Sequence, residues 1–392
     1  MCPVDVGGAT PHTARFPHLR ILKRYAASLT VALLIGVAAY LALTPASAHP
    51  VAWESKAGPG YAGAFAVNTR LVAVSIVPLG AYAAPEHIVL ANDGRLYLSA
   101  AAGNILRMQP DGTAPEVFAN TGGRVLGFDF DSAGNLIAAD SHRGLLSISP
   151  DRRVTVLADS ADGVPIGFAD AVIVARSGKV YFTDATTRFP PGRPGHILDT
   201  EAAALLDVVE HSSTGRVLEY DPAIRSTRVI ARGLCFANGI ALSADERSLL
   251  VAETGAYRVW RIAVTANQLD VRSPSPLASL VLDNLPGLPD NLMRGLDGRI
   301  WVGLPEPRAP FLDDFAAWPT IRQLALRLPK SLRPAGTPYG HVVAFLEDGR
   351  VVDDLQDPSG AFDKATGVTE TRDRLYLQTL NHRGLGWLPR VP

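Results

Sequence analysis

The sequence predicts an all-β chain that folds as a six-bladed β-propeller behind an N-terminal transmembrane helix. Three observations support this prediction: a short strand motif occurs six times, the composition favours turns, and one uncharged apolar segment lies near the N-terminus. The 35 glycines and 30 prolines, together with only 19% charged residues, are typical of a β protein with many turns.

The repeated motif is a turn with Asp, Asn or Gly, followed by an apolar run such as Leu96-Tyr97-Leu98. Its copies lie at residues 92–98, 133–138, 177–182, 246–251, 297–302 and 372–377. Each unit alone would expose an apolar face, and stacking the units in a ring buries it. We therefore expect a propeller over residues 70–390, with insertions near 188–214 and 305–339. A strand near residues 71–77 is expected to close the ring by pairing with C-terminal strands.

The apolar segment covers residues 26–43 and carries no charge. Its length is just enough to span a bilayer core. Basic residues precede it, and no Lys or Arg follows until Lys56. This asymmetry predicts a cytoplasmic basic tail at residues 1–25 and a membrane-anchored propeller on the non-cytoplasmic side, joined by a tether at 49–69. Cleavage after Ala48 is the alternative and would give a secreted protein.

Charge and cysteine content exclude two classes of protein. The net charge of −1 gives no electrostatic basis for binding nucleic acid. The two cysteines, Cys2 and Cys235, lie far apart in the sequence, so no disulfide framework is expected. Cys235 is most simply interpreted as a small buried apolar residue.

The second insertion contains apolar residues at helical spacing between residues 311 and 333, with Pro319 allowed near a helix start. We expect a helix that packs on its own propeller. The alternative is an interfacial helix that contacts the membrane or covers the pocket, with cations from Arg322, Arg327, Lys330 and Arg333.

Propellers bind ligands at the mouth of the central channel, so oxygen donors just before the first strand of each blade are candidates for a site. Glu86, Asn238, Asp290 and Asn291 share this phase of the repeat, and Asp170 holds the equivalent position in the third blade. Two carboxylates and two amides around one axis give a hard-oxygen site of charge about −2, which suits Ca²⁺ or another divalent metal.

Taken singly, each of these residues is also compatible with an ordinary turn or surface position. Asn238-Gly239 would be a turn in front of the strand that follows it. Gly239 would let a backbone come close to a ligand. Their shared phase in the repeat favours a joint site.

A family resemblance rests on these same motifs. Phe236-Ala237-Asn238-Gly239-Ile240, Pro289-Asp290-Asn291 and Pro85-Glu86 resemble the metal-binding motifs of calcium-dependent six-bladed propellers, which include paraoxonases and regucalcin-type gluconolactonases. The likeness is strongest to the strictosidine synthase-like group, of the adipocyte plasma membrane-associated protein type. This resemblance rests on segments 215–222, 250–254 and 286–291, and it extends over about residues 70–390.

The resemblance implies a Ca²⁺-dependent hydrolase that acts on a small-molecule ester or lactone. In such enzymes the metal polarises the carbonyl and stabilises the oxyanion. The matching positions imply that Glu86, Asn238, Asp290 and Asn291 bind the metal. They also imply that Asp290 is catalytic and helps to activate water.

Three departures from the family pattern bear on this expectation. Ala169 stands where the family often has Asn, and Leu126 lies near the position of the paraoxonase His. Thr366 lies near the catalytic Glu of plant strictosidine synthases, so a Pictet–Spengler condensation is not expected. The alternative function is a non-catalytic, membrane-anchored binding propeller with a structural metal.

Overall fold

The computed structural model describes residues 25, 28–32, 35–36, 39–40, 43–45, 47–192, 199–334 and 336–390. The expected cytoplasmic tail, except for its last residue, and about half of the expected anchor lie outside the described residues. Within them no helix is both long and apolar enough to cross a membrane, so the anchor stays a prediction. The chain divides into two compact units, residues 1–47 with 324–333 and residues 48–323 with 334–392, and the propeller belongs to the second.

The described strands form six sheets of four or five strands, which confirms the predicted six-bladed β-propeller. Blade 1 consists of β2 (Ile88–Leu90), β3 (Leu96–Ser99), β4 (Asn104–Met108) and β5 (Glu116–Asn120). Blade 2 consists of β6 (Val125–Phe130), β7 (Leu136–Asp140), β8 (Gly144–Ile148) and β9 (Val154–Ala158). Blade 3 consists of β12 (Ala169–Val174), β13 (Val180–Asp184), β14 (Gly215–Asp221) and β15 (Ser226–Leu234). Blade 4 consists of β16 (Ala237–Leu242), β17 (Ser248–Glu253), β18 (Arg258–Ala263) and β20 (Ala278–Leu282). Blade 5 consists of β21 (Leu292–Arg294), β22 (Ile300–Gly303), β23 (Gly340–Phe345) and β24 (Val351–Asp357).

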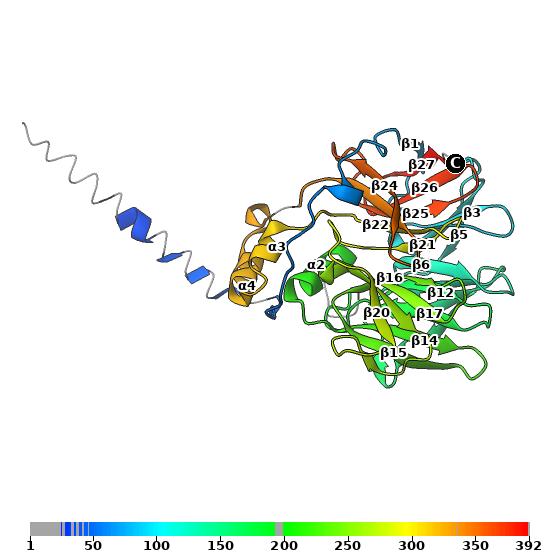
Figure 1. Ribbon diagram of the computed structural model, residues 1–392, viewed down its shortest axis with the longest axis horizontal. Helices are drawn as coiled ribbons and strands as arrows, with labels where there is room; N and C mark the ends of the chain where they lie inside the picture. The colour runs from blue at the N-terminus through cyan, green and yellow to red at the C-terminus, as the bar shows by residue number, and fades with distance from the viewer. Residues whose placement is uncertain are drawn as a thin grey trace, which may run out of the picture. The chain divides into compact units, whose positions relative to one another are not determined.

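Blade 6 combines the two ends of the propeller. Its strands are β25 (Ala365–Glu370), β26 (Arg374–Thr379), β27 (Gly384–Pro389) and β1 (Ser75–Pro78). Strand β1 pairs antiparallel with β27, from Ser75 opposite Trp387 to Pro78 opposite Gly384, and the two strands lie side by side in Figure 1. This pairing confirms the predicted closure of the ring.

The strand order explains why the repeat is visible in the sequence. All six copies of the motif form the second strand of a blade, from β3 to β26, in which nearly every residue is buried. A hydrophobic cluster fills each junction between neighbouring blades; the cluster between blades 1 and 2 includes Phe118 and Phe128, and the one between blades 1 and 6 includes Leu96 and Tyr376. First strands of neighbouring blades, such as β12 and β16, contact each other and so surround the central axis.

Minor elements complete the described chain. Strand β19 (Leu269–Asp270) pairs parallel with β15, and β10 (Ser160–Ala161) pairs with β11 (Val164–Pro165). The short 3₁₀ turns are η1 (Gly63–Phe65), η2 (Ala101–Gly103), η3 (Thr254–Ala256) and η4 (Lys330–Leu332).

The first insertion contains a helix that was not expected, α2 (Thr200–Glu210). The Asp199 carboxylate accepts a hydrogen bond from the Ala202 N–H at 2.7 Å and so caps the first turn. The helix ends at His211, whose φ of 59° is left-handed. The signal was present in the sequence, because a capping Asp precedes an Ala- and Leu-rich run.

The second insertion forms two short helices, α3 (Pro310–Asp314) and α4 (Pro319–Arg327), so the expectation of a single helix was wrong. Pro319 begins α4, as expected. Arg322, expected among the cations of an interfacial helix, is fully buried. Its guanidinium donates to the carbonyl oxygens of Val209 (2.6 Å) and Ala316 (3.0 Å). Arg322 is therefore not available to a membrane surface.

The segment at residues 49–69, expected as a tether, belongs to the same compact unit as the propeller and makes main-chain hydrogen bonds within it. The Val51 N–H donates to the Glu210 carbonyl at 2.8 Å, and the Trp53 N–H donates to the Ala316 carbonyl at 3.2 Å. This part of the segment therefore lies against both insertions.

Candidate metal-binding site at the start of the inner strands

The first strands of four blades begin with a β-bulge. In β16 the pairing passes from Ala237–Glu253 to Ile240–Val251, so two residues have no partner in the ladder, and β6, β12 and β25 show similar shifts. A bulge re-aims side chains and is common beside functional sites. The residues skipped by the pairing include Leu126, Asp170, Asn238 and Thr366.

Asn238 lies inside β16 and not in front of it, which corrects the expectation from the sequence. The preceding Phe236 has a left-handed φ of 59°, which turns the chain into the bulge. A Cβ atom on Gly239 would lie 2.3 Å from the Asp290 carbonyl oxygen, and the Gly239 N–H donates to that oxygen at 3.2 Å. Gly239 therefore permits close contact with the backbone of blade 5, and the expected approach to a ligand stays a prediction.

Glu86 lies directly in front of β2, and its main chain is held by blades 5 and 6. The Asn291 side-chain amide donates to the Glu86 carbonyl at 2.8 Å, and the Thr366 hydroxyl donates to the same oxygen at 3.1 Å. Asp290 and Asn291 are fixed in turn, since their N–H groups donate to the carbonyls of Gly303 and Thr366 at 3.0 Å. Backbone bonds therefore place these side chains without the help of a ligand.

A chain of hydrogen bonds also sets the orientation of the Asn291 amide. The Thr369 hydroxyl donates to the Ile88 carbonyl at 2.5 Å, so it accepts from the Gln378 amide nitrogen at 3.1 Å. Gln378 Oε1 is therefore an acceptor, and it accepts a hydrogen bond from Asn291 Nδ2 at 3.2 Å. Both Asn291 bonds use Nδ2, which leaves Oδ1 as the acceptor atom of this side chain.

Three carboxylates are buried together at this end of the channel. Burial raises the pKa of Asp290 well above its usual range, and the nearby Glu86 charge raises it further. Burial and the charges of Asp290 and Glu86 likewise raise the pKa of Asp170. Burial also raises the pKa of Glu86, although Arg124 opposes this shift. A cluster of this kind favours either protonation or a bound cation.

Arg124 is the one described cation whose side chain pairs directly with Glu86 in this cluster. Its Nη2 donates to Glu86 Oε2 at 2.5 Å, and its side chain is only 12% exposed. Its Nη1 is a buried donor without a hydrogen-bond partner. The guanidinium therefore neutralises part of the carboxylate charge and keeps one donor unused.

The side chain of Asn238 supplies the observation most relevant to a metal. A hydrogen bond from this side chain helps to lower the pKa of Asp290, so its amide nitrogen faces that carboxylate. Its Oδ1 is buried and has no hydrogen-bond partner. A buried amide oxygen without a donor is costly, and a hard cation such as Ca²⁺ would satisfy it. The donor chemistry therefore fits the implied ion.

Among the residues that the structure describes, no three His, Cys, Asp or Glu side chains are arranged to hold one metal ion. A site here would therefore need amide oxygens as well as carboxylates, as the four predicted residues provide. The structure brings Glu86, Asn238, Asp290 and Asn291 together, with exposures of 2–6%. Their roles as ligands, and the catalytic role of Asp290, stay predictions.

Two members of the cluster were missing from the predicted set. Asp170 was recognisable by its phase in the repeat, whereas nothing in the sequence near Arg124 signals its ion pair. The departures from the family pattern contribute little that can ligate a metal: Ala169 and Leu126 are buried apolar residues, and Thr366 uses its hydroxyl on the Glu86 carbonyl.

Comparison with known proteins identifies two family models along the chain. The model described as strictosidine synthase matches residues 170–267, and the model described as strictosidine synthase-like, N-terminal, matches residues 63–108. Protein STRICTOSIDINE SYNTHASE-LIKE 7 of Arabidopsis thaliana is 32% identical, over 83% of this chain and 82% of that protein. The adipocyte plasma membrane-associated protein of Salmo salar is 30% identical, over 80% of this chain and 76% of that protein.

Solved structures with the same fold are more distant in sequence. A gluconolactonase of Xanthomonas campestris superposes with a TM-score of 0.57 at 20% identity, covering 89% of this chain and 99% of that one. A calcium-binding regucalcin of Agrobacterium tumefaciens gives a TM-score of 0.50 at 13% identity, covering 79% and 90%. At these identities the likeness concerns the fold alone.

Proposed function

This chain belongs to the strictosidine synthase-like family, and we propose that it is a Ca²⁺-dependent hydrolase of lactones or aryl esters. The observation that carries the proposal is the buried cluster in which Asn238 Oδ1 has no donor and three carboxylates lie together. Fold neighbours named gluconolactonase and calcium-binding regucalcin are compatible with this proposal.

In this proposal Glu86, Asn238, Asp290 and Asn291 hold the ion, and another divalent metal is an alternative to Ca²⁺. When bound, the ion supplies polarisation of the substrate carbonyl and stabilisation of the oxyanion. Asn291 contributes Oδ1, because its hydrogen-bond network commits Nδ2 elsewhere. Glu86 shares its charge with Arg124, so the protein part of the site is less negative than its carboxylates alone suggest.

Asp290 has the role of proton acceptor in the hydrolysis. A carboxylate oxygen of Asp290 takes a proton from the attacking water while the water oxygen bonds to the carbonyl carbon. The bond from that carbon to the alkoxy or ring oxygen then breaks, and the leaving oxygen takes the proton. Arg124 Nη1 is a free donor for an oxygen atom of the substrate. Atoms balance as ester plus water giving acid plus alcohol.

The test is a panel of lactones and aryl esters, assayed with calcium and with chelator. Hydrolysis that disappears in chelator and in Asp290→Asn is the expected result. Hydrolysis that persists unchanged in both would contradict the proposal.

A second candidate function is a binding propeller in which the metal is structural. Two observations favour it: Arg124 already pairs with Glu86, and Ala169 offers no oxygen where the family often has Asn. Calcium binding in calorimetry, with no turnover of any substrate in the panel, would support this candidate over the hydrolase.

A further inference from the structure

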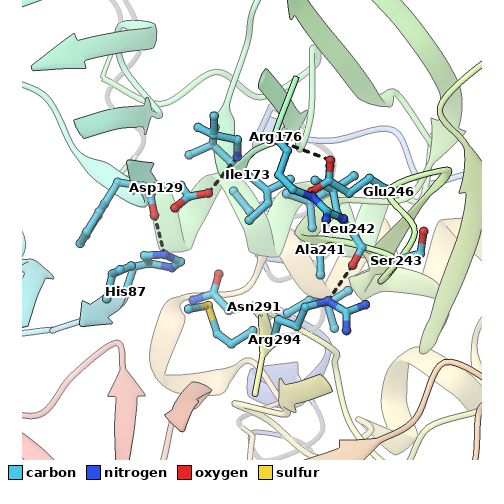
Figure 2. A pocket seen from close by; sticks show the side chains of 18 of the residues that line it. His87, Asp129, Ile173, Arg176, Ala241, Leu242, Ser243, Glu246, Asn291 and Arg294 are labelled. Atoms are coloured by element: carbon cyan, nitrogen blue, oxygen red, sulfur yellow. Dashed lines mark hydrogen bonds and ion pairs between the residues drawn. The ribbon is translucent and has the colours of Figure 1, made fainter. Parts of the chain in front are cut away.

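The central channel contains a cavity of about 320 Å³, within the size range of about 300–1,000 Å³ that is usual for small-molecule sites. Its lining comes from the first strands of blades 1 to 5 and is mainly apolar, with Phe128, Val172, Ile240 and Leu292 among the side chains. Figure 2 shows His87 and Asn291 with their side chains directed into this space. The cavity is therefore apolar along its walls and polar at one end.

The polar end lies beside the candidate metal site, and the mouth lies at the other end of the same strands. His87 and Asn291 stand at the starts of β2 and β21, whereas Arg176, Glu246 and Arg294 stand at or beyond the ends of β12, β16 and β21. The Arg176 side chain is 76% exposed, so this end reaches solvent. Arg294 lies three positions after Asn291, which corresponds to a length of about 10 Å along an extended strand.

His87 lines the cavity, and its ring carries a hydrogen-bond acceptor that has no partner. Its residue exposure is 5%, and Nε2 lies 2.9 Å from the Phe128 carbonyl oxygen. A carbonyl only accepts, so Nε2 carries the proton, and in the neutral ring Nδ1 is a lone-pair acceptor. Nδ1 is buried and has no partner.

The charged side chains that line the cavity already have hydrogen-bond or ion-pair partners. Each Asp129 oxygen accepts one main-chain hydrogen bond at 2.8 Å, Oδ1 from the Phe130 N–H and Oδ2 from the Val174 N–H. Arg176 pairs with Glu246 at 2.7 Å, and Arg294 pairs with Glu347. An anionic ligand would therefore find no free cation among these side chains, and both Asp129 oxygens already accept main-chain hydrogen bonds.

We propose that the channel is a binding site for a small, neutral, mainly apolar molecule that bears one N–H or O–H donor at its leading end. The ligand enters at the mouth near Arg176, packs along the apolar strands, and donates its hydrogen bond to His87 Nδ1. This site adjoins the proposed hydrolase site, with which it shares Asn291, and it stands whether or not that site turns over a substrate.

Indole and 1-methylindole are suitable probes, because they share an apolar bicyclic shape and differ in the single N–H donor. Isothermal titration calorimetry on the full chain should show indole binding about 2- to 12-fold more tightly than 1-methylindole, the ratio expected for one hydrogen bond. In His87→Phe, which keeps a ring and removes the acceptor, this preference should disappear. Equal affinity of the wild-type chain for the two probes would overturn the proposal without reference to any variant.

A second experiment tests where in the cavity the probe binds. Met293→Trp fills the cavity wall and should abolish binding of both probes, whereas Met293→Leu, which keeps the volume, should retain it within about twofold. A crystal structure with indole should show the ring between β12 and β21 and its nitrogen next to His87. Indole bound elsewhere, or a channel that holds only water at saturating indole, would refute the site.

Discussion

The side-chain amide of Asn291 donates a hydrogen bond of 2.8 Å to the main-chain carbonyl of Glu86, although 205 residues separate the two in sequence. Asn291 belongs to blade 5 and Glu86 to blade 1, so the bond reaches past blade 6 at the end of the channel. Two predicted metal ligands are thereby held by the fold itself.

Asn291→Ala should lower the free energy of unfolding by about 1–3 kcal/mol, because the buried Gln378 Oε1 loses its donor and the Glu86 carbonyl keeps only Thr366. Chemical denaturation in chelator measures this loss without a contribution from metal. The exposed Asn92→Ala is the control and should stay within about 0.5 kcal/mol of wild type. Equal effects of the two substitutions would mean that the bond contributes nothing.

Asp290→Asn should separate stability from metal binding. In chelator at pH 7 the variant should be at least as stable as wild type, because the raised pKa of Asp290 means that its buried charge destabilises the folded state. With calcium at a hundred times the dissociation constant, wild type should gain about 2.7 kcal/mol and the variant far less. Thermal melts with and without calcium measure both effects, and Asp348→Asn, an exposed carboxylate, serves as the control. A full calcium response in Asp290→Asn would refute the metal assignment.

Asp207 should make stability depend on pH. Burial raises its pKa from 3.8 to about 7, so between about pH 4 and pH 7 the folded state holds a proton that the unfolded state has released. The free energy of unfolding should therefore fall as pH rises through this window, by on the order of 1–4 kcal/mol for this group. Asp207→Asn should flatten that part of the curve measured by urea denaturation. A curve of unchanged slope would show that Asp207 does not retain its proton.

Arg124→Gln should strengthen calcium binding, roughly tenfold, because it removes a positive charge from beside the carboxylates. Arg107→Gln, which breaks a surface ion pair with Glu116, is the matched control and should leave calcium affinity unchanged. Calorimetric titration with calcium distinguishes the two. Weaker binding in Arg124→Gln would indicate that the guanidinium orients Glu86 and does not compete with the ion.

The location of the chain is testable by fusion. A reporter that is active only outside the cytoplasm, joined after residue 390, should be active and membrane-bound if residues 26–43 anchor the chain. The same reporter recovered in soluble form, on a chain that begins at His49, would indicate cleavage after Ala48. Activity confined to a cytoplasmic reporter would contradict export altogether.

The blades were predictable because the second strand of each blade is almost completely buried. Runs such as Leu96-Tyr97-Leu98 are buried on both faces, so apolar residues and a preceding turn suffice to mark them. The predicted site residues share a phase in that repeat, and a ring converts equal phase into a common location. This is why Glu86, Asn238, Asp290 and Asn291 could be grouped from the sequence alone.

What could not be predicted depends on contacts between blades and insertions. The ion pair of Arg124 with Glu86 joins residues of different blades, and Gly239 faces the backbone of Asp290 in the next blade. The burial of Arg322 likewise requires carbonyls from α2 and from the segment around Val51. Local patterns carry no information about such partners.

The pairing of β1 with β27 has a consequence for the order in which the chain folds. These strands lie roughly 310 residues apart, so the ring cannot close until nearly the whole propeller has been synthesised. Contacts of such high sequence separation form slowly. Thr366, which holds the Glu86 carbonyl, belongs to the blade that closes last. The binding end of the channel is therefore completed in the same late step as the ring, and any truncated chain that lacks β27 would leave β1 without its partner and β26 with an open edge.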